Sequence, residues 1–192
     1  MKRKISAKEI IVPAVSLFLI CLVVTALLAV TDKFTQPQIE KLAIETENKT
    51  KAEVLTGADS FSDAKTYEQD GVTYEYYEGM CNGSMVGYVF STSAKGYGGD
   101  IDVMVGIGTD GLVQGVSILS ISETAGLGMN AKNESFLTQF KGRSGEIGVA
   151  KNNPSESEIQ ALTGATITSK AMAAAVNTAL AIYSEIGGES NG

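Results

Sequence analysis

Three threonine side chains gather in residues 162–169, which read LTGATITS. An alanine-rich stretch with a helical pattern follows at once, so this segment is expected to precede a helix. The first N–H groups of a helix lack intrahelical acceptors and carry partial positive charge, and they therefore favour an anion such as a phosphate. Ser and Thr are also common at a helix N-terminus that is capped only for local hydrogen bonding, so two interpretations stay open. The residues concerned are Thr163, Gly164, Ala165, Thr166 and Thr168.

Two other glycine-rich segments could approach a flat ligand closely. Residues 96–99 (GYGG) lie between two expected strands, and residues 122–128 (SETAGLG) follow the end of a strand. Glycine allows the backbone to come near a planar ring system, which also needs a few N–H donors. Ordinary turns are the alternative, although turns alone would need only one or two of these glycines.

Two matches to the dinucleotide-binding pattern G-x-G-x-x-G/A are not expected to bind a dinucleotide. Gly106–Gly111 follows a strand, but the next residues, LVQGVSILSIS, are typical of a strand where the fingerprint requires a helix. The segment Thr109–Gly111 (TDG) indicates a hairpin instead. Gly126–Ala131 is followed by polar residues, and no acidic residue ends a second strand at the required distance.

The composition limits the chemistry that this chain can perform unaided. It contains no histidine and two cysteines, of which Cys21 lies in an apolar run and Cys81 in the polar part. The cysteines are not expected to pair, and histidine-based catalytic triads and histidine-ligated haem are excluded. A Cys/His zinc site and a protein-ligated iron–sulfur cluster are excluded too. We therefore expect no metal site, and any chemistry must come from a bound cofactor.

A membrane-spanning helix is predicted near the N-terminus. Residues 10–30 contain no charged side chain, and these 21 residues, at a rise of ~1.5 Å each, cross about 30 Å of hydrocarbon. Four basic residues within 1–9 predict a cytoplasmic N-terminus and place everything after the span outside. A signal peptide cleaved near Val24–Ala26 is the alternative, but the apolar run is long for one.

The net charge divides the chain in the same way. The whole chain has a net charge of −7. Residues 1–9 have a net charge of +3, so the remaining residues have a net charge of −10. An acidic exterior domain is not expected to bind nucleic acid, because basic contacts to phosphates supply most of that affinity. The lipid bilayer is expected as a partner of the apolar span, whereas anionic lipid head groups mildly repel the acidic domain.

After the span, the pattern predicts one domain of the α+β class. Residues 31–56 are interpreted as a membrane-proximal helix or linker, with Thr35 as a cap and Pro37 in its first turn. Residues 57–186 form the domain, which begins with a polar connection over 57–70 and ends before a flexible tail, 187–192.

Alternation with period two predicts an antiparallel sheet within this domain, and helical spacing predicts helices that flank it. The expected strands are Val72–Tyr77, Met85–Ser91, Ile101–Ile107 and Val113–Ile121, and the expected helices are Glu134–Phe140 and Ser169–Ile186.

Two motifs, in this order behind one membrane span, resemble those of the covalent FMN-binding subunits of membrane redox pumps. They are ETAGLG at Glu123–Gly128 and LTGATITS at Leu162–Ser169, and the similarity extends to KFTQPQIEKL after the span and to YGGDI at Tyr97–Ile101. The chain is most similar to the G subunits of Rnf complexes. Those G subunits have relatives in the C subunits of sodium-translocating NADH:quinone oxidoreductases, which are usually longer.

This resemblance implies a covalently bound FMN cofactor. In the family, a separate flavin transferase moves FMN from FAD onto the last threonine of the pattern Asp-x-x-Ser/Thr-Gly-Ala-Thr, forming a phosphoester. Carried over, the modified residue is Thr166, and Thr163, Gly164 and Ala165 complete the pattern. The aspartate position holds Gln160, whose amide is expected to serve as a hydrogen-bonding substitute.

The resemblance also implies contacts with the isoalloxazine ring and the phosphate. Lys95, Tyr97 and Met129 are possible neighbours of the ring, and Lys170 either neutralises the phosphate or is an ordinary exposed helix lysine. The residues expected to line the ring are Glu123, Thr124, Gly126, Leu127 and Gly128.

The implied function is an electron relay in a membrane-bound ferredoxin:NAD oxidoreductase complex that translocates Na+ or H+. The other components of the Rnf complex and, transiently, the flavin transferase are the implied partners, and the relay has no substrate site of its own. Three alternatives remain: a C-type subunit of a sodium-translocating NADH:quinone oxidoreductase, an anchored non-redox ligand-binding or structural module, and an anchored stand-alone flavin reductase.

Overall fold

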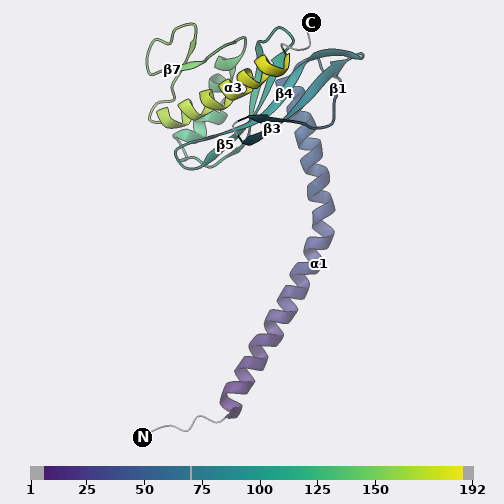
Figure 1. Ribbon diagram of the computed structural model, residues 1–192. Coiled ribbons are helices and arrows are strands. Elements are labelled where there is room, and N and C mark those ends of the chain that lie inside the picture. Colours follow the sequence, from purple (N-terminus) through teal and green to yellow (C-terminus); the bar gives the residue numbers. More distant parts are fainter. Residues whose placement is uncertain (1–6, 70, 188–192) are drawn as a thin grey trace. The chain divides into compact units, whose positions relative to one another are not determined.

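The computed structural model describes residues 7–69 and 71–187 (Figure 1). The chain divides into two compact units, Met1–Glu47 and Asn48–Gly192, and each is described by itself. The predicted N-terminal segment 1–9 and the predicted tail 187–192 lie largely outside the described residues.

Helix α1, Ala7–Val54, forms the described part of the first unit and extends into the second. Its residues Ile11–Lys33 are long and apolar enough to cross a membrane, by length and composition, which agrees with the predicted span at 10–30. The predicted start of a separate helix near Thr35 and Pro37 is wrong, because α1 continues through both residues. A proline in the first turn of a new helix and a proline inside a long helix are difficult to distinguish in a sequence.

An antiparallel sheet forms the centre of the second unit. Its strands follow the order β1-β3-β4-β5-β6, and β2 also pairs with β3. All four predicted strands are confirmed, and β3, β4 and β5 are longer than predicted. The turn between β5 and β6 confirms that the first G-x-G-x-x-G match is a hairpin. The strands are β1 Ser60–Phe61, β2 Lys65–Gln69, β3 Val72–Cys81, β4 Ser84–Lys95, β5 Asp100–Gly108 and β6 Val113–Ile121.

The interpretation of residues 57–70 as a polar connection is wrong. This segment contains β1 and β2, and β2 pairs with β3 along its whole length, with Tyr67 opposite Tyr74. The alternation in KTYEQ is weak, and all five of its residues are exposed or half-buried. A strand of this kind gains its stability mainly from pairing, which hydrophobic periodicity does not reveal.

The chain after the sheet is mostly short elements before one long helix. The predicted helix Glu134–Phe140 is divided between α2 and η2, and the last helix begins three residues earlier than predicted. Strands β7 and β8, which form a separate parallel pair, were not predicted. The elements are η1 Gly128–Lys132, α2 Glu134–Leu137, η2 Thr138–Phe140, β7 Gly148–Ala150, β8 Glu158–Gln160 and α3 Thr166–Gly187.

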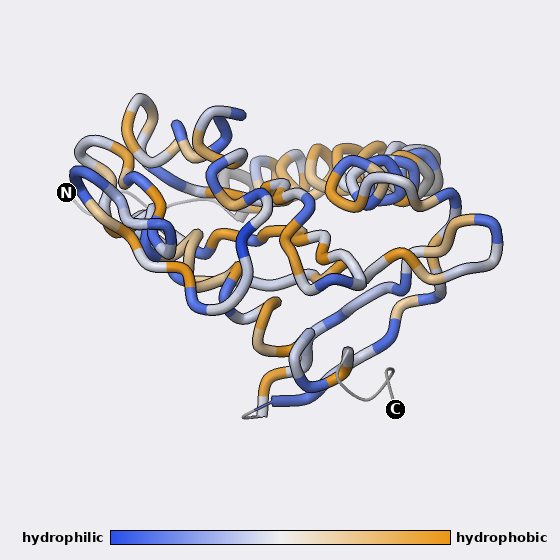
Figure 2. Tube along the Cα trace, turned by 90° about the horizontal axis from the view of Figure 1, so that it is seen from above, coloured by the Kyte–Doolittle hydropathy of each residue, from blue (hydrophilic) through white to orange (hydrophobic). Residues whose placement is uncertain are grey.

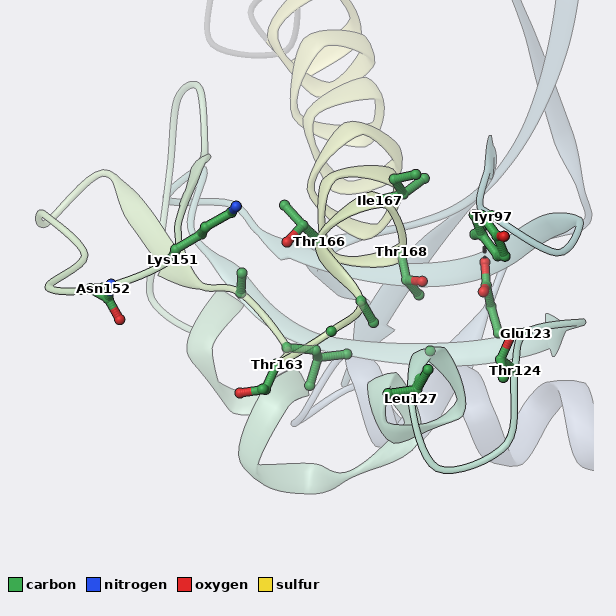
Figure 3. Close-up of a pocket in the computed structure, with 15 residues that line it drawn as sticks. Tyr97, Glu123, Thr124, Leu127, Lys151, Asn152, Thr163, Thr166, Ile167 and Thr168 are labelled. Carbon is green, nitrogen blue, oxygen red and sulfur yellow. Dashed lines mark hydrogen bonds between the residues drawn. The ribbon is translucent and has the colours of Figure 1, made fainter.

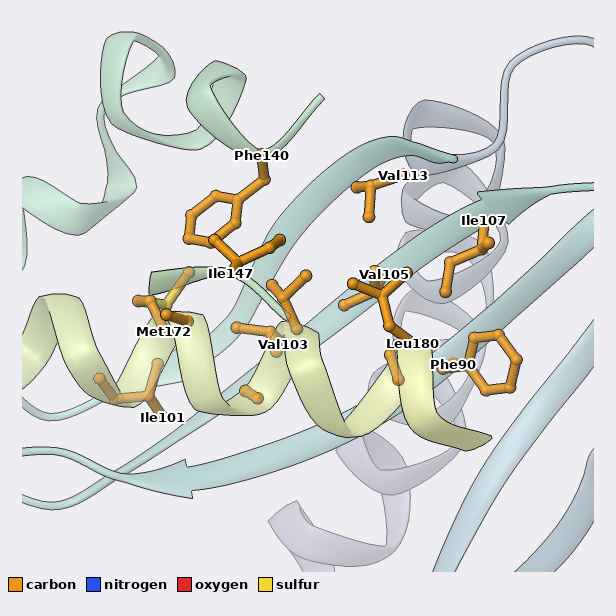
Figure 4. Close-up of a cluster of buried hydrophobic side chains, with 14 of the residues drawn as sticks. Phe90, Ile101, Val103, Val105, Ile107, Val113, Phe140, Ile147, Met172 and Leu180 are labelled. Carbon is orange, nitrogen blue, oxygen red and sulfur yellow. The ribbon is translucent and has the colours of Figure 1, made fainter. Parts of the chain in front are cut away.

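The main hydrophobic core lies between α3 and one face of the sheet (Figure 4). Alternate residues of β5 point into it, and Ala171, Ala175 and Ala179 are buried on the helix at a spacing of four. Their small side chains permit a close approach, and the Thr92 hydroxyl of β4 donates to the Ala175 carbonyl at 3.0 Å. Figure 2 shows the hydrophobic segments of the trace along helices and strands, with hydrophilic segments frequent in the loops. Helix α3 is therefore held firmly to the sheet.

A second cluster buries the last turn of α1 together with other side chains of the sheet, among them Val89 and Met104. Val54 and Leu55 are almost fully buried there, and the backbone at Val54 lies directly against two strands. A Cβ at Gly106 of β5 would lie 2.1 Å from the Val54 carbonyl oxygen, and one at Gly115 of β6 would lie 2.9 Å from Val54 Cα. These paired glycines leave the space that the end of α1 occupies.

Candidate functional site

A cavity of about 840 Å³ lies at the N-terminal end of α3 (Figure 3). Four segments supply its wall: the turn between β4 and β5, the loop after β6, the residues that follow β7, and the loop from β8 into α3. The lining residues are Tyr97, Glu123, Thr124, Leu127, Gly128, Lys151, Asn152, Ala161, Leu162, Thr163, Gly164, Ala165, Thr166, Ile167 and Thr168.

Helix α3 directs its first amides at this cavity. The first amide that bonds back onto the preceding turn is that of Ser169, which donates to the Ala165 carbonyl at 3.0 Å. The N–H groups of Thr166, Ile167 and Thr168 precede it, in the turn where helix geometry leaves amides without intrahelical acceptors. All three residues line the cavity. This part of the wall therefore suits a phosphate or another anion.

Ser169 fixes the loop that enters the helix. Its hydroxyl accepts the Leu162 N–H at 2.9 Å and donates to the Ala165 carbonyl at 2.9 Å, and the residue is fully buried. These bonds tie the loop to the helix, but neither of them caps a first-turn amide of α3. Thr163, Thr166 and Thr168 all line the cavity.

The three threonine hydroxyls are not equivalent. Thr163 is exposed, Thr166 is half-buried, and only 1% of the surface of Thr168 is exposed. All three line the cavity. A macromolecule that acts on one of these hydroxyls reaches Thr163 and Thr166 more easily than Thr168.

The two sequence motifs meet in the cavity wall at Leu127 and Gly164. Gly164 has φ of +75°, which favours glycine, and a Cβ there would lie 3.0 Å from Leu127 Cδ2. Leu127 and Ile167 are 44% and 53% exposed, and Tyr97 is 72% exposed. Three large side chains therefore stand open on the wall of the cavity, and they offer apolar surface to a flat ligand.

Glu123 holds the GYGG turn in place. Its Oε1 accepts the Tyr97 N–H at 2.6 Å and the Gly98 N–H at 3.3 Å. A Cβ at Gly128 would lie 2.6 Å from its other oxygen, Oε2, and 2.8 Å from Thr168 Oγ1. Gly128 thus makes room for this carboxylate, as does Gly96 of the GYGG turn, where a Cβ would lie 2.1 Å from Glu123 Oε1. The carboxylate acts first as a support for the wall.

Replacing Glu123 with Ala is expected to loosen the turn at Tyr97. Two amides lose an acceptor, and the loss should lower the free energy of unfolding by about 1–3 kcal/mol. Chemical denaturation and hydrogen exchange of the turn amides measure this effect. Glu123→Gln is the control, because its amide oxygen still accepts both N–H groups, and equal destabilisation by both changes would contradict the interpretation.

Lys151 and Asn152 were missed by the sequence analysis. They follow β7, well before the motif that they face, and their segment carries no periodic pattern. Figure 3 shows the Lys151 side chain directed toward Thr166 across the cavity. A cation there complements the amides of α3, so both favour an anion at the same place.

Some candidate residues lie elsewhere. Four of the candidate residues do not line the cavity: Gly126, Lys95, Met129 and Lys170. Gly126 has φ of +76° and its carbonyl accepts from the Asn130 side chain at 2.9 Å, so it shapes the turn behind the wall. Lys170 is exposed on α3, as an ordinary helix lysine would be.

A carboxylate closes the loop that carries Lys151. Glu158 accepts the Ser155 N–H at 3.0 Å and its hydroxyl at 2.8 Å, and these bonds lower the pKa of Glu158 below its ordinary value of 4.5. A depressed carboxyl pKa stabilises the fold above the ordinary value, and this contribution disappears as the pH falls through the folded-state pKa. Exchange of the Ser155 amide should therefore quicken below pH 4.5, after correction for the intrinsic rate. Glu158→Gln should weaken that pH dependence.

The arrangement suits a ligand with a flat apolar part and an anionic group. The volume of the cavity falls within the range of about 300–1,000 Å³ that is usual for cofactor sites. The open side chains of Tyr97, Leu127 and Ile167 can contact the flat part, and the start of α3 with Lys151 can bind the anion. Among the described residues, no group of His, Cys, Asp and Glu is placed to hold a metal ion.

Comparison with known proteins gives matches to both parts of the chain. Residues 96–181 match the family described as FMN-binding domain, and residues 1–54 match the RnfG N-terminal region. The G subunit of the Na+-translocating ferredoxin:NAD+ oxidoreductase complex of Acetobacterium woodii is 34% identical, over 88% of this chain and 89% of that protein. The G subunit of the proton-translocating ferredoxin:NAD+ oxidoreductase complex of Clostridium ljungdahlii is 32% identical, over 86% of each chain.

A solved structure has the same fold. The C subunit of the Na+-translocating NADH-quinone reductase of Parabacteroides distasonis superposes with a TM-score of 0.55 at 18% identity, and covers 74% of this chain and 81% of its own. This likeness confirms the predicted α+β architecture.

Proposed function

The chain belongs to the family of G subunits of ion-translocating ferredoxin:NAD+ oxidoreductase complexes, and on this premise we propose that it carries electrons within such a complex by means of a covalently bound FMN. The observation that supports the proposal most is that the two motifs line one cavity at the start of α3. The match to the RnfG N-terminal region favours the G type over the C type. The named relatives include a Na+-translocating and a proton-translocating complex, so the proposal keeps both ions.

The cavity fits FMN in size and in chemistry. Leu127, Gly128 and Tyr97 would contact the isoalloxazine ring, and Glu123 would hold the turn that carries Tyr97. Thr124 would supply a polar group on the same side. When bound, FMN supplies the electron-carrying chemistry, while the protein fixes its position and surroundings.

Thr166 is proposed as the attachment residue. Its Oγ1 would form the bond to the flavin phosphorus while the pyrophosphate bond of FAD breaks, AMP leaves, and the hydroxyl proton passes to a base of the flavin transferase. A threonine hydroxyl needs such a base, and this chain has no histidine to provide one. The phosphodiester keeps one negative charge, which the first amides of α3 and the Lys151 ammonium group would stabilise.

The predicted topology completes the proposal. The basic N-terminal residues favour a cytoplasmic N-terminus, so the FMN-binding domain would lie on the extracytoplasmic side of the membrane. Little free FMN would be available to rebind there. A covalent tether would keep the cofactor at a high effective concentration beside its cavity.

Intact-mass measurement tests the proposal. The chain is produced together with its flavin transferase and purified in detergent. We expect a mass excess of one FMN less one water, together with a yellow protein whose colour survives denaturation. A colourless chain with the unmodified mass would contradict the proposal and would favour a non-redox module.

A further inference from the structure

The segment of the cavity wall that contains Lys151 and Asn152 begins where the regular pairing of β7 and β8 ends. Ala150 pairs with Gln160, and the Ala161 N–H donates to the Ala150 carbonyl at 2.8 Å. Lys151 and Asn152 come next, and both are exposed residues of the cavity wall. The strand pair alone therefore does not fix the position of Lys151.

The Gln160 side chain extends this pairing by one residue. Its Nε2 donates to the Lys151 carbonyl. The bond requires a donor, which an amide has and an ionised carboxylate lacks. Gln160 therefore makes a contact that the aspartate expected from the family pattern could not make. In this contact the side chain acts as a donor and does not substitute for a carboxylate.

Gln139 of η2 holds Gln160 in turn. Its Oε1 accepts the Gln160 N–H at 2.7 Å, and its Nε2 lies 3.4 Å from the Gln160 carbonyl, to which it donates. Arg143 supports the same network, because its guanidinium donates to the carbonyls of Gln139 and Glu156. The network therefore joins η2, the end of β8 and both ends of the loop that carries Lys151.

We propose that Gln160 is a positioning residue of the flavin site: Gln139 holds its backbone, and its side-chain amide keeps the Lys151 segment against the cavity. The inference rests on the proposed function, because Lys151 is the cation assigned to the flavin phosphate. Gln160 itself does not line the cavity, so it acts through Lys151. Removal of the donor leaves the Lys151 carbonyl without this partner and frees the segment to move away from Thr166.

Two variants remove the donor in different ways. Gln160→Glu keeps the shape of the side chain and replaces its N–H donor with a carboxylate, and Gln160→Met keeps the length without polar atoms. Gln114→Glu is the matched control. The Gln114 amide accepts from the Thr56 hydroxyl through Oε1, which glutamate preserves, and Gln114 is not part of the cavity wall.

The first measurement is hydrogen exchange by mass spectrometry on the full-length, flavin-free chain in detergent. Both Gln160 variants should exchange about fivefold faster in the peptide around residues 151–157, as expected for the loss of one hydrogen bond. The control should exchange like the wild type. Unchanged exchange of this peptide in both Gln160 variants would overturn the inference.

The second measurement is the visible circular dichroism of the chain after flavin attachment, scaled to covalent flavin content by intact mass. Both Gln160 variants should change the flavin bands, whereas the control keeps them. Identical bands despite faster exchange would show that the segment does not position the flavin. If the wild-type chain carries no covalent flavin, the proposed function fails, and the exchange measurement still decides whether Gln160 holds Lys151.

Discussion

Thr166→Val is expected to abolish covalent flavin attachment completely. Valine has nearly the shape of threonine and is β-branched like it, so the start of α3 should be preserved, but the oxygen that would bond to phosphorus is gone. The chain is produced with its transferase, separated under denaturing conditions and examined for flavin fluorescence and intact mass. Noncovalent flavin is lost during denaturation, so the assay reports only the covalent link.

The same change at neighbouring threonines provides the controls. Thr163 is exposed and Thr168 is buried, and both line the same cavity. Thr163→Val and Thr168→Val should each retain the fluorescent band if Thr166 is the acceptor. A band that persists in Thr166→Val and disappears in Thr163→Val would move the attachment site three residues upstream.

Gly106→Ala is expected to lower the free energy of unfolding by about 1–3 kcal/mol, because the added methyl group overpacks the core. The added Cβ would lie 2.1 Å from the Val54 carbonyl oxygen, and the obstacle is backbone. Rotation of a side chain cannot relieve this overlap, so the end of α1 has to move away from the sheet. Chemical denaturation measures the loss of stability, and hydrogen exchange of residues 50–55 locates it.

Gly99→Ala is the matched control. It is also a glycine of the domain without a positive φ, but a Cβ there would lie 3.3 Å from Ser122 Cβ. That neighbour is a side-chain atom that needs to yield by only a few tenths of an ångström. Gly106→Ala should therefore be clearly the less stable of the two variants. Equal unfolding midpoints would show that the end of α1 is not packed tightly against the glycines.

Much of the fold could be predicted because its signals are local. The strand from Val113 to Ile121 has the bounds that alternation predicts, and the long helix was placed to within three residues of its start. Alternating and helical patterns record which face of an element is buried, so they survive in a single sequence. Strand β2 was missed because its side chains are largely exposed, and its stability comes from pairing with β3.

The candidate site was predicted only in part, for a related reason. The two motifs were recognised from their glycines and hydroxyls, and nine of their ten candidate residues line the cavity, Gly126 being outside it. Lys151 belongs to an irregular loop, and an exposed lysine in a loop is too common to indicate a binding site. No spacing rule connects it to Thr166, because the connection runs through the β7–β8 pair and the side chain of Gln160.

Local patterns in the chain were enough to establish the apolar span, the sheet-and-helix domain, the lack of histidine chemistry and the two motifs that resemble covalent FMN-binding subunits. The packing of the domain was needed to bring four residues of the first motif and Thr163–Thr168 into one cavity and to assign Glu123 to the Tyr97 turn. The tertiary structure also placed the end of α1 against Gly106 and Gly115, and showed that the Gln160 side chain donates a hydrogen bond to the Lys151 carbonyl. This difference arises because patterns report the burial of single elements, whereas contacts between distant segments depend on where the packed core places them.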